Sequence, residues 1–107
     1  MRRIIPIILT LAGVVAFASD EAPKHVIEQK DKSFSETEIT VKPGQVLVFK
    51  NSDEVTHNVF STSKANAFNI KVQQPGGSSE VTFAEEGTTE VRCAIHPKMK
   101  LTVTVKK

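Results

Sequence analysis

From residue 24 onward, short apolar runs alternate with polar turns. Leu101–Val105 alternates apolar and polar residues strictly, and Glu38–Val41 does so with β-branched residues. This period of two is typical of half-buried β-strands. Val46–Lys50 is almost continuously apolar, which predicts a strand that is buried on both faces or lies at the centre of a sheet. Further strands are predicted at Lys24–Lys30, Val81–Phe83 and Thr88–Cys93.

Turn signals separate these runs. Pro43 and Gly44 stand in turn-like order, Asn51–Glu54 is polar throughout, and Gln74–Ser78 contains a proline and two glycines. Val55–Phe60 lies between two of these breaks, while Phe34 and Phe68–Ile70 are expected to reach the core. No sustained helical period occurs after residue 18. Many short strands between turns predict a single all-β sandwich domain with one modest core.

The N-terminus reads as a secretory signal. Arg2 and Arg3 precede the apolar stretch Ile4–Val15, and Ala16-Phe17-Ala18 resembles a cleavage site. The apolar stretch is interrupted by a proline and a glycine, and it is short for a membrane span of about 20 residues. We therefore expect residues 1–18 to be a signal peptide, 19–107 to be the exported domain, and the processed protein to be periplasmic and not membrane-spanning.

Charge and composition argue against two classes of function, nucleic-acid binding and enzymatic catalysis. The chain has 14 basic and 12 acidic residues, and loss of Arg2 and Arg3 would leave 12 of each. A neutral domain gives no support for nucleic-acid binding, which needs a clustered basic face, and its small size favours a monomer. No acid–base pair, Ser/His/Asp order or glycine-rich phosphate loop is recognisable. The sequence therefore predicts a protein that is not an enzyme.

Four residues at two places in the chain suggest a metal site. Cys93, His96 and Met99 lie within seven residues of each other, and His57 stands upstream in Thr56-His57-Asn58-Val59. Two His, one Cys and one Met are the ligands of blue-copper electron-transfer sites. Cys93 is the sole cysteine, so it has no disulfide partner within the chain. His25, near the predicted mature N-terminus, is interpreted instead as solvent-facing.

Rival interpretations remain open at this point. Zinc also accepts Cys and His, although a thioether is a poor zinc ligand. If Met99 merely packs in the core, a zinc site of His57, Cys93, His96 and a water stays possible. A copper-binding protein for copper tolerance or delivery is the functional alternative, but it calls for additional exposed Met or His. An oxidase or a nitrite reductase fragment would need ligands for a second copper centre.

These motifs resemble the cupredoxin family, most closely its plastocyanin/amicyanin branch. The resemblance covers roughly Phe34 to Val105. It is carried by Phe34–Gln45, by Thr56–Val59, and by Gly87 followed by Val91–Met99. The two residues between His96 and Met99 match the short ligand loop of amicyanins.

The resemblance implies a Greek-key β-sandwich with one type 1 copper ion. It implies His57, Cys93 and His96 as equatorial ligands and Met99 as a weak axial ligand. It also implies that the exposed edge of His96 is the electron port, and that a backbone amide, here from Asn58, donates to the cysteine sulfur.

The partner is expected to be a redox protein. Lys98 stands where an apolar docking residue would be expected, which argues for a general shuttle rather than a carrier dedicated to methylamine dehydrogenase. Lys64, Lys98 and Lys100 are expected to form a basic rim at the port if the loop with Lys64 lies there. Such a rim would favour partners with an acidic docking face.

Overall fold

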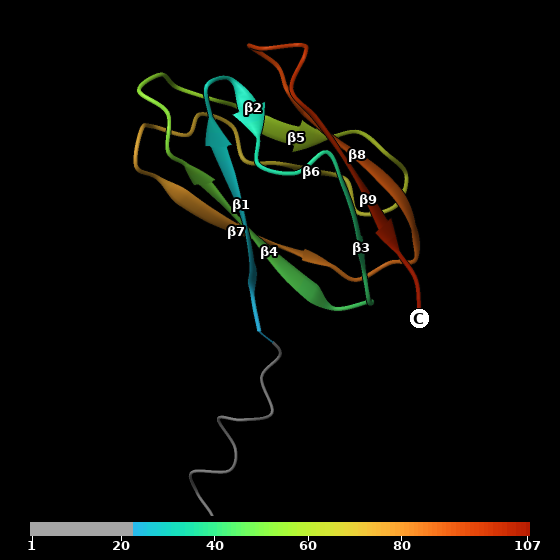
Figure 1. Ribbon diagram of the computed structural model, residues 1–107. Coiled ribbons are helices and arrows are strands. Elements are labelled where there is room, and N and C mark those ends of the chain that lie inside the picture. The colour runs from blue at the N-terminus through green and yellow to red at the C-terminus, as the bar shows by residue number, and fades with distance from the viewer. Residues whose placement is uncertain (1–22) are drawn as a thin grey trace, which may run out of the picture.

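The computed structural model describes residues 23–107, which fold into two β-sheets packed face to face (Figure 1). The predicted signal peptide, residues 1–18, lies outside the described residues. Over the described range the chain forms strands and no helix, so no helix there could cross a membrane. The strands are β1 (His25–Lys30), β2 (Ser33–Phe34), β3 (Glu38–Val41), β4 (Gln45–Asn51), β5 (Val59–Ser61), β6 (Phe68–Asn69), β7 (Ser78–Phe83), β8 (Gly87–Cys93) and β9 (Lys100–Val105).

The first sheet has the order β2-β1-β4-β7. β1 runs parallel to β4, with Ile27 beside Phe49, and β7 pairs antiparallel with the other edge of β4. The apolar run of β4 therefore occupies an internal position of the sheet, as its composition predicts. Leu47 and Phe49 face the core, whereas Val48 on the opposite face is only half-buried.

The second sheet has the order β3-β9-β8-β5-β6. β8 and β9 form an antiparallel pair in which Val91 lies opposite Leu101. β3 pairs parallel with β9, so a strand from the first half of the domain borders the last strand of the chain. The chain thus crosses repeatedly between the sheets, as from β3 to β4 and from β4 to β5, in agreement with the expected Greek-key sandwich.

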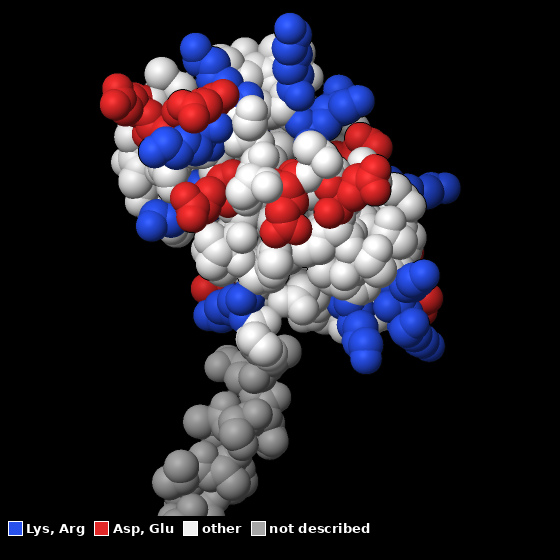
Figure 2. Space-filling model, viewed as in Figure 1, with Lys and Arg blue, Asp and Glu red and all other residues white. Residues whose placement is uncertain are grey.

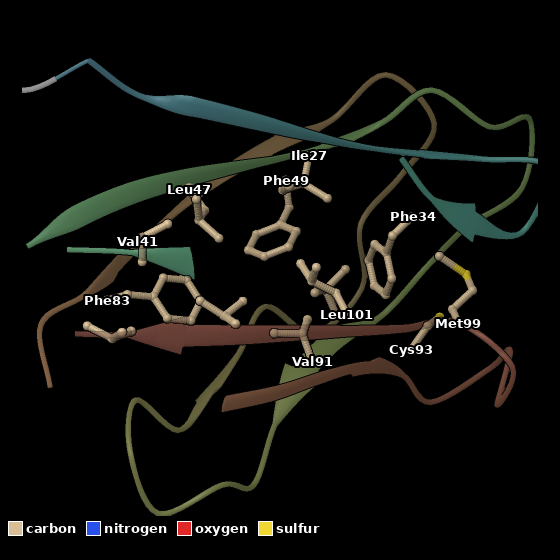
Figure 3. Close-up of a cluster of buried hydrophobic side chains, with 13 residues drawn as sticks. Ile27, Phe34, Val41, Leu47, Phe49, Phe83, Val91, Cys93, Met99 and Leu101 are labelled. Carbon is tan, nitrogen blue, oxygen red and sulfur yellow. The ribbon is translucent and has the colours of Figure 1, made fainter. Parts of the chain in front are cut away.

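Apolar side chains from both sheets meet in a single core (Figure 3). Phe49 is fully buried, and its ring packs against those of Phe34 and Phe68, with centroids 6.3 and 5.9 Å away. Leu101 and Val91 close the core from the second sheet. Burial of each such side chain contributes about 1.5–3 kcal/mol, so the core holds the two sheets in fixed relative positions.

Two local details differ from the sequence-based expectations. Ser78, expected in the Gln74–Ser78 turn, is the first residue of β7. Asn51, expected in the Asn51–Glu54 turn, is the last residue of β4. β5 begins only at Val59, so His57 precedes that strand and makes an isolated bridge to Gln73. The backbone of His57 is nevertheless held at both its N–H and its C=O, at 3.1 and 2.7 Å from Gln73.

The loop 94–99, between β8 and β9, projects at one pole of the sandwich, at the top of Figure 1, whereas the C-terminus lies at the opposite pole. The turn between β4 and β5, which leads to His57, reaches the same pole.

Candidate metal centre

Strand pairing brings the two distant ligand segments together. β5 pairs antiparallel with β8, and Val59 lies opposite Cys93. His57 is two residues before Val59, and His96 is three residues after Cys93, so both imidazoles extend past the end of this strand pair. Further support comes from the Ala94 N–H, which donates to the Asn58 carbonyl at 3.1 Å.

Three donor atoms converge at this pole. The Cys93 Sγ lies 3.6 Å from His57 Nδ1 and 3.7 Å from His96 Nδ1, and the two Nδ1 atoms are 3.1 Å apart. A triangle with these sides has a centre about 2.0 Å from each atom, close to metal–nitrogen bonds of ~2.0–2.1 Å and somewhat short of metal–thiolate bonds of ~2.3 Å. Three lone-pair donors facing one point suit a bound cation, so the residues fit a metal ion.

Most of the donors are shielded from solvent. His57, Cys93 and Met99 are buried, whereas His96 is half-buried. Figure 3 shows Met99 and Cys93 at the same end of the core. The Met99 N–H donates to the His96 carbonyl at 2.9 Å, which closes the loop into a tight turn. One edge of the donor set therefore reaches the surface, through His96.

Asn58 connects the ligand segments. Its backbone N–H donates to Cys93 Sγ at 3.3 Å, and its carbonyl accepts from Ala94. A hydrogen bond to the sulfur withdraws electron density from a thiolate and fixes its direction. This contact is the one that the cupredoxin resemblance implies for Asn58.

Asp53 is a functional residue that the sequence analysis missed. Its Oδ2 accepts hydrogen bonds from His57 Nε2 at 2.8 Å and from the Lys32 N–H at 2.8 Å, and its Oδ1 accepts from the Asp31 N–H at 2.9 Å. Because His57 Nε2 is occupied in this way, Nδ1 is left free to face Cys93. A carboxylate on the outer nitrogen of a ligating histidine orients the ring and raises its basicity.

The same contacts stabilise the charged carboxylate. The hydrogen bond from the Lys32 N–H, followed by the contacts with His57 and the Asp31 N–H, lowers the pKa of Asp53 from 3.8 to about 2 against the opposing effect of burial. Asp53 is therefore anionic across the physiological pH range, and it ties the β1–β2 turn to His57.

A groove of about 510 Å³ lies beside His96. It is lined by Asp31, Lys32, Ile95, His96, Pro97 and Lys98. Ile95 is 52% exposed and provides an apolar patch. Figure 2 shows Lys and Arg side chains over this upper pole, with Asp and Glu side chains at its left and a band of Asp and Glu across the middle of the same face.

Lys64 does not belong to the expected basic rim, because its loop does not lie at the port. The loop that contains Lys64 packs along β8: the Ser63 hydroxyl accepts from the Glu90 N–H, and the Thr89 hydroxyl donates to the Ala65 carbonyl. Thr89 and Glu90 lie toward the start of β8, away from the 94–99 loop. Lys32, which the sequence analysis did not select, lines the groove with Lys98 instead.

His25 lies away from the donor set. It opens β1 beside Leu47, and its Nε2 lies 2.6 Å from Glu36 Oε2. Its side chain is 41% exposed. It is therefore only partly solvent-facing, because it shares a hydrogen bond with a carboxylate.

Most of the chain matches a known protein family. The model of the family described as copper binding proteins, plastocyanin/azurin family, matches residues 22–106. The chain belongs to this family. Membership confirms the cupredoxin resemblance and identifies copper as the metal. His57, Cys93, His96 and Met99 are positioned to bind one ion.

Individual relatives agree with this assignment. The methylamine utilization protein MauL of Methylophilus methylotrophus is 26% identical over 91 residues, which are 82% of this chain and 52% of that protein. The chain thus spans about half the length of this curated relative.

Solved structures show the same fold. A Cu(I) form of an amicyanin variant superposes with a TM-score of 0.72 at 25% identity, over 83% of this chain and 89% of that one. The copper-containing nitrite reductase of Thermus scotoductus SA-01 matches with a TM-score of 0.74 at 20% identity, over 81% of this chain but 23% of that one. The second match concerns the fold alone.

Proposed function

We propose that this cupredoxin is a periplasmic electron carrier in which His57, Cys93, His96 and Met99 hold one copper ion. The observation that carries the proposal is the convergence of the Cys93 sulfur and two imidazole nitrogens, with separations of 3.1 to 3.7 Å, at one end of a rigid sandwich. When bound, copper supplies a one-electron Cu(I)/Cu(II) couple, and this donor set is acceptable to both states.

The protein's part is to keep the donors still. Asp53 fixes the His57 ring, the Asn58 amide fixes the Cys93 sulfur, and the two backbone bonds to Gln73 fix the main chain of His57. Ligands that cannot relax between oxidation states keep the reorganisation energy of electron transfer low. The thioether of Met99 is buried at the same end of the core as Cys93.

Electrons are proposed to pass through the half-buried edge of His96. The groove beside it combines the exposed apolar side chain of Ile95 with Lys32 and Lys98. This chemistry suits a redox protein whose docking face is acidic, and association with it would weaken as salt screens the charges. A general shuttle fits better than a dedicated methylamine-oxidation partner, because Lys98 replaces an apolar docking residue.

Export and a non-enzymatic role complete the proposal. The signal-like residues 1–18 support periplasmic delivery. Among the residues that the structure describes, His57, Cys93 and His96 form the one group of three or more His, Cys, Asp or Glu side chains arranged to hold a metal. A second centre of the kind that copper oxidases and nitrite reductases need is not supported.

Electron self-exchange and copper release separate a carrier from a copper-delivery protein. Self-exchange is measured from NMR line broadening in mixtures of the Cu(I) and Cu(II) forms, and release is measured with an excess of a copper chelator. A carrier is expected to show rapid self-exchange and slow release. Rapid release without detectable self-exchange would favour delivery and contradict the proposal.

A further inference from the structure

Two glutamine side chains are buried without complete hydrogen bonding. Gln29 follows Ile27 on the inner face of β1 and is 0% exposed. Neither its Nε2 nor its Oε1 has a hydrogen-bond partner within the described part of the chain, and the same holds for Oε1 of the buried Gln73. Buried polar atoms are nearly always hydrogen-bonded, so these three atoms require an explanation.

Strand register places both glutamines around Asn51. Gln29 lies opposite Asn51 in the parallel β1–β4 pair. The Asn51 side-chain amide donates to the Gln73 carbonyl at 2.9 Å, and Gln73 in turn holds the His57 backbone at both N–H and C=O. Gln29 also lies opposite Phe34, which belongs to the same buried cluster as Met99. Both glutamines therefore neighbour Asn51, in the network that also holds the main chain of His57.

The other polar groups nearby are already engaged. Gln73 Nε2 donates to the Phe49 and Gly77 carbonyls at 2.7 and 3.1 Å, and Asn51 uses its side-chain oxygen to accept from the Asp53 N–H at 2.9 Å. The side-chain atoms left without a hydrogen-bond partner are one donor, Gln29 Nε2, and two acceptors, Gln29 Oε1 and Gln73 Oε1. An internal water typically makes about three hydrogen bonds to buried groups of this kind.

We propose that Gln29 and Gln73 hold an internal water molecule next to Asn51, and that this hydrated pocket stabilises the oxidised state of the metal. A polar, hydrated shell solvates the more highly charged state of a metal better than an apolar shell does, and the polarity of the shell thereby tunes the reduction potential. The effect on the oxidised metal (the redox half of this inference) rests on the proposed function, whereas the presence of the water (the hydration half) does not.

The hydration half is tested by NMR on the metal-free and the diamagnetic Cu(I) proteins. Nuclear Overhauser effects are recorded between water and the side-chain amide protons of ¹⁵N-labelled glutamines. Gln29 is expected to show the direct contact of a long-lived water. The exposed Gln74, and Gln45, whose amide donates to the Pro23 carbonyl, serve as controls without such a contact. Absence of the Gln29 contact, or a direct Gln29–Gln73 side-chain contact in its place, would overturn the proposal.

The redox half is tested by the reduction potentials of Gln29→Leu and the matched surface variant Gln74→Leu. Gln29→Leu is expected to shift the potential upward, because an apolar side chain no longer stabilises the oxidised state, whereas Gln74→Leu should leave it unchanged. An unchanged potential in a folded, copper-loaded Gln29→Leu protein would overturn the redox half. A chain that bound no copper would contradict the proposed function while the NMR result still stood.

Discussion

Replacement of Asp53 by Asn is expected to destabilise the protein at neutral pH and to have little effect in strong acid. Each carboxylate oxygen accepts a hydrogen bond: Oδ1 from the Asp31 N–H, and Oδ2 from the Lys32 N–H and His57 Nε2. An amide has one oxygen and one NH₂ group. Whichever way the amide is turned, its NH₂ group therefore faces a donor, and at least one hydrogen bond is lost.

The lowered pKa of Asp53 gives the size of the expected loss in unfolding free energy. A pKa lowered from 3.8 to about 2 corresponds to roughly 2 kcal/mol of extra stability when the group is charged. The side chain is 13% exposed, and solvent screening reduces the effect. We therefore expect Asp53→Asn to lower the free energy of unfolding by about 1–2 kcal/mol at pH 7.

The sign of the pH dependence follows from the direction of the shift. Because the folded-state pKa lies below the unfolded one, the contribution is fully present above about pH 4 and is lost as the pH falls toward about 2. The wild-type and Asp53→Asn stabilities should therefore converge over this window.

Urea denaturation of the metal-free protein, followed by far-UV circular dichroism between pH 7 and pH 2, measures the difference. The chain has no Trp or Tyr, so circular dichroism is the practical probe. Asp31→Asn is the matched control, because its exposed side chain is changed while its donor N–H is kept, and Asn tolerates the positive φ of 54° at this position. A stability difference that stays constant down to pH 2 would refute the reasoning.

Three further variants test other parts of the structure. Phe49→Ala should lower the unfolding free energy by about 3–5 kcal/mol, since it empties the centre of the core, whereas the exposed Val72→Ala should change it by less than about 0.5 kcal/mol; denaturant midpoints at constant slope measure both. Met99→Leu should retain the fold, with a cost below about 1.5 kcal/mol, but shift the reduction potential upward in voltammetry, because Cu(I) tolerates fewer ligands than Cu(II); an unchanged potential would place the thioether outside the copper site. Lys98→Glu should slow oxidation of the Cu(I) protein by hexacyanoferrate(III) about fivefold at 0.1 M ionic strength, whereas Lys64→Glu, which lies away from the groove, should alter the stopped-flow rate less; equal effects would contradict a basic port.

Much of the fold could be read from local pattern. The alternation in Leu101–Val105 and Glu38–Val41 predicted β9 and β3 closely, since each strand buries one face. Which strands pair could not be read in this way. The parallel pairs β1–β4 and β3–β9 join segments about 20 and 60 residues apart, and period-two patterns carry no information about partners.

The donor set was accessible to sequence reasoning because residue type limits the chemistry. Cys93, His96 and Met99 stand close together in one loop, and His57 is followed by Asn58. Asp53 was missed because it lies in a polar turn, Asn51–Glu54, where an acidic residue is unremarkable by composition. Its role depends on a second turn at Asp31 and Lys32, about 20 residues away, which only the folded chain brings near.

The positions of Lys64 and Lys32 relative to the groove likewise could not be predicted from the sequence. The loop between β5 and β6 could fold toward either pole, and the Ser63 and Thr89 hydrogen bonds that hold it along β8 leave no signal in the sequence.

The optical and electron paramagnetic resonance spectra of the copper-loaded protein, beside those of Cys93→Ala, test the central claim most directly. A thiolate bound to Cu(II) among two imidazoles and a thioether predicts intense absorption near the red end of the visible spectrum and a type 1 resonance signal, both absent from Cys93→Ala. A copper-loaded wild-type protein that is colourless, or whose spectra survive the loss of the Cys93 sulfur, would contradict it.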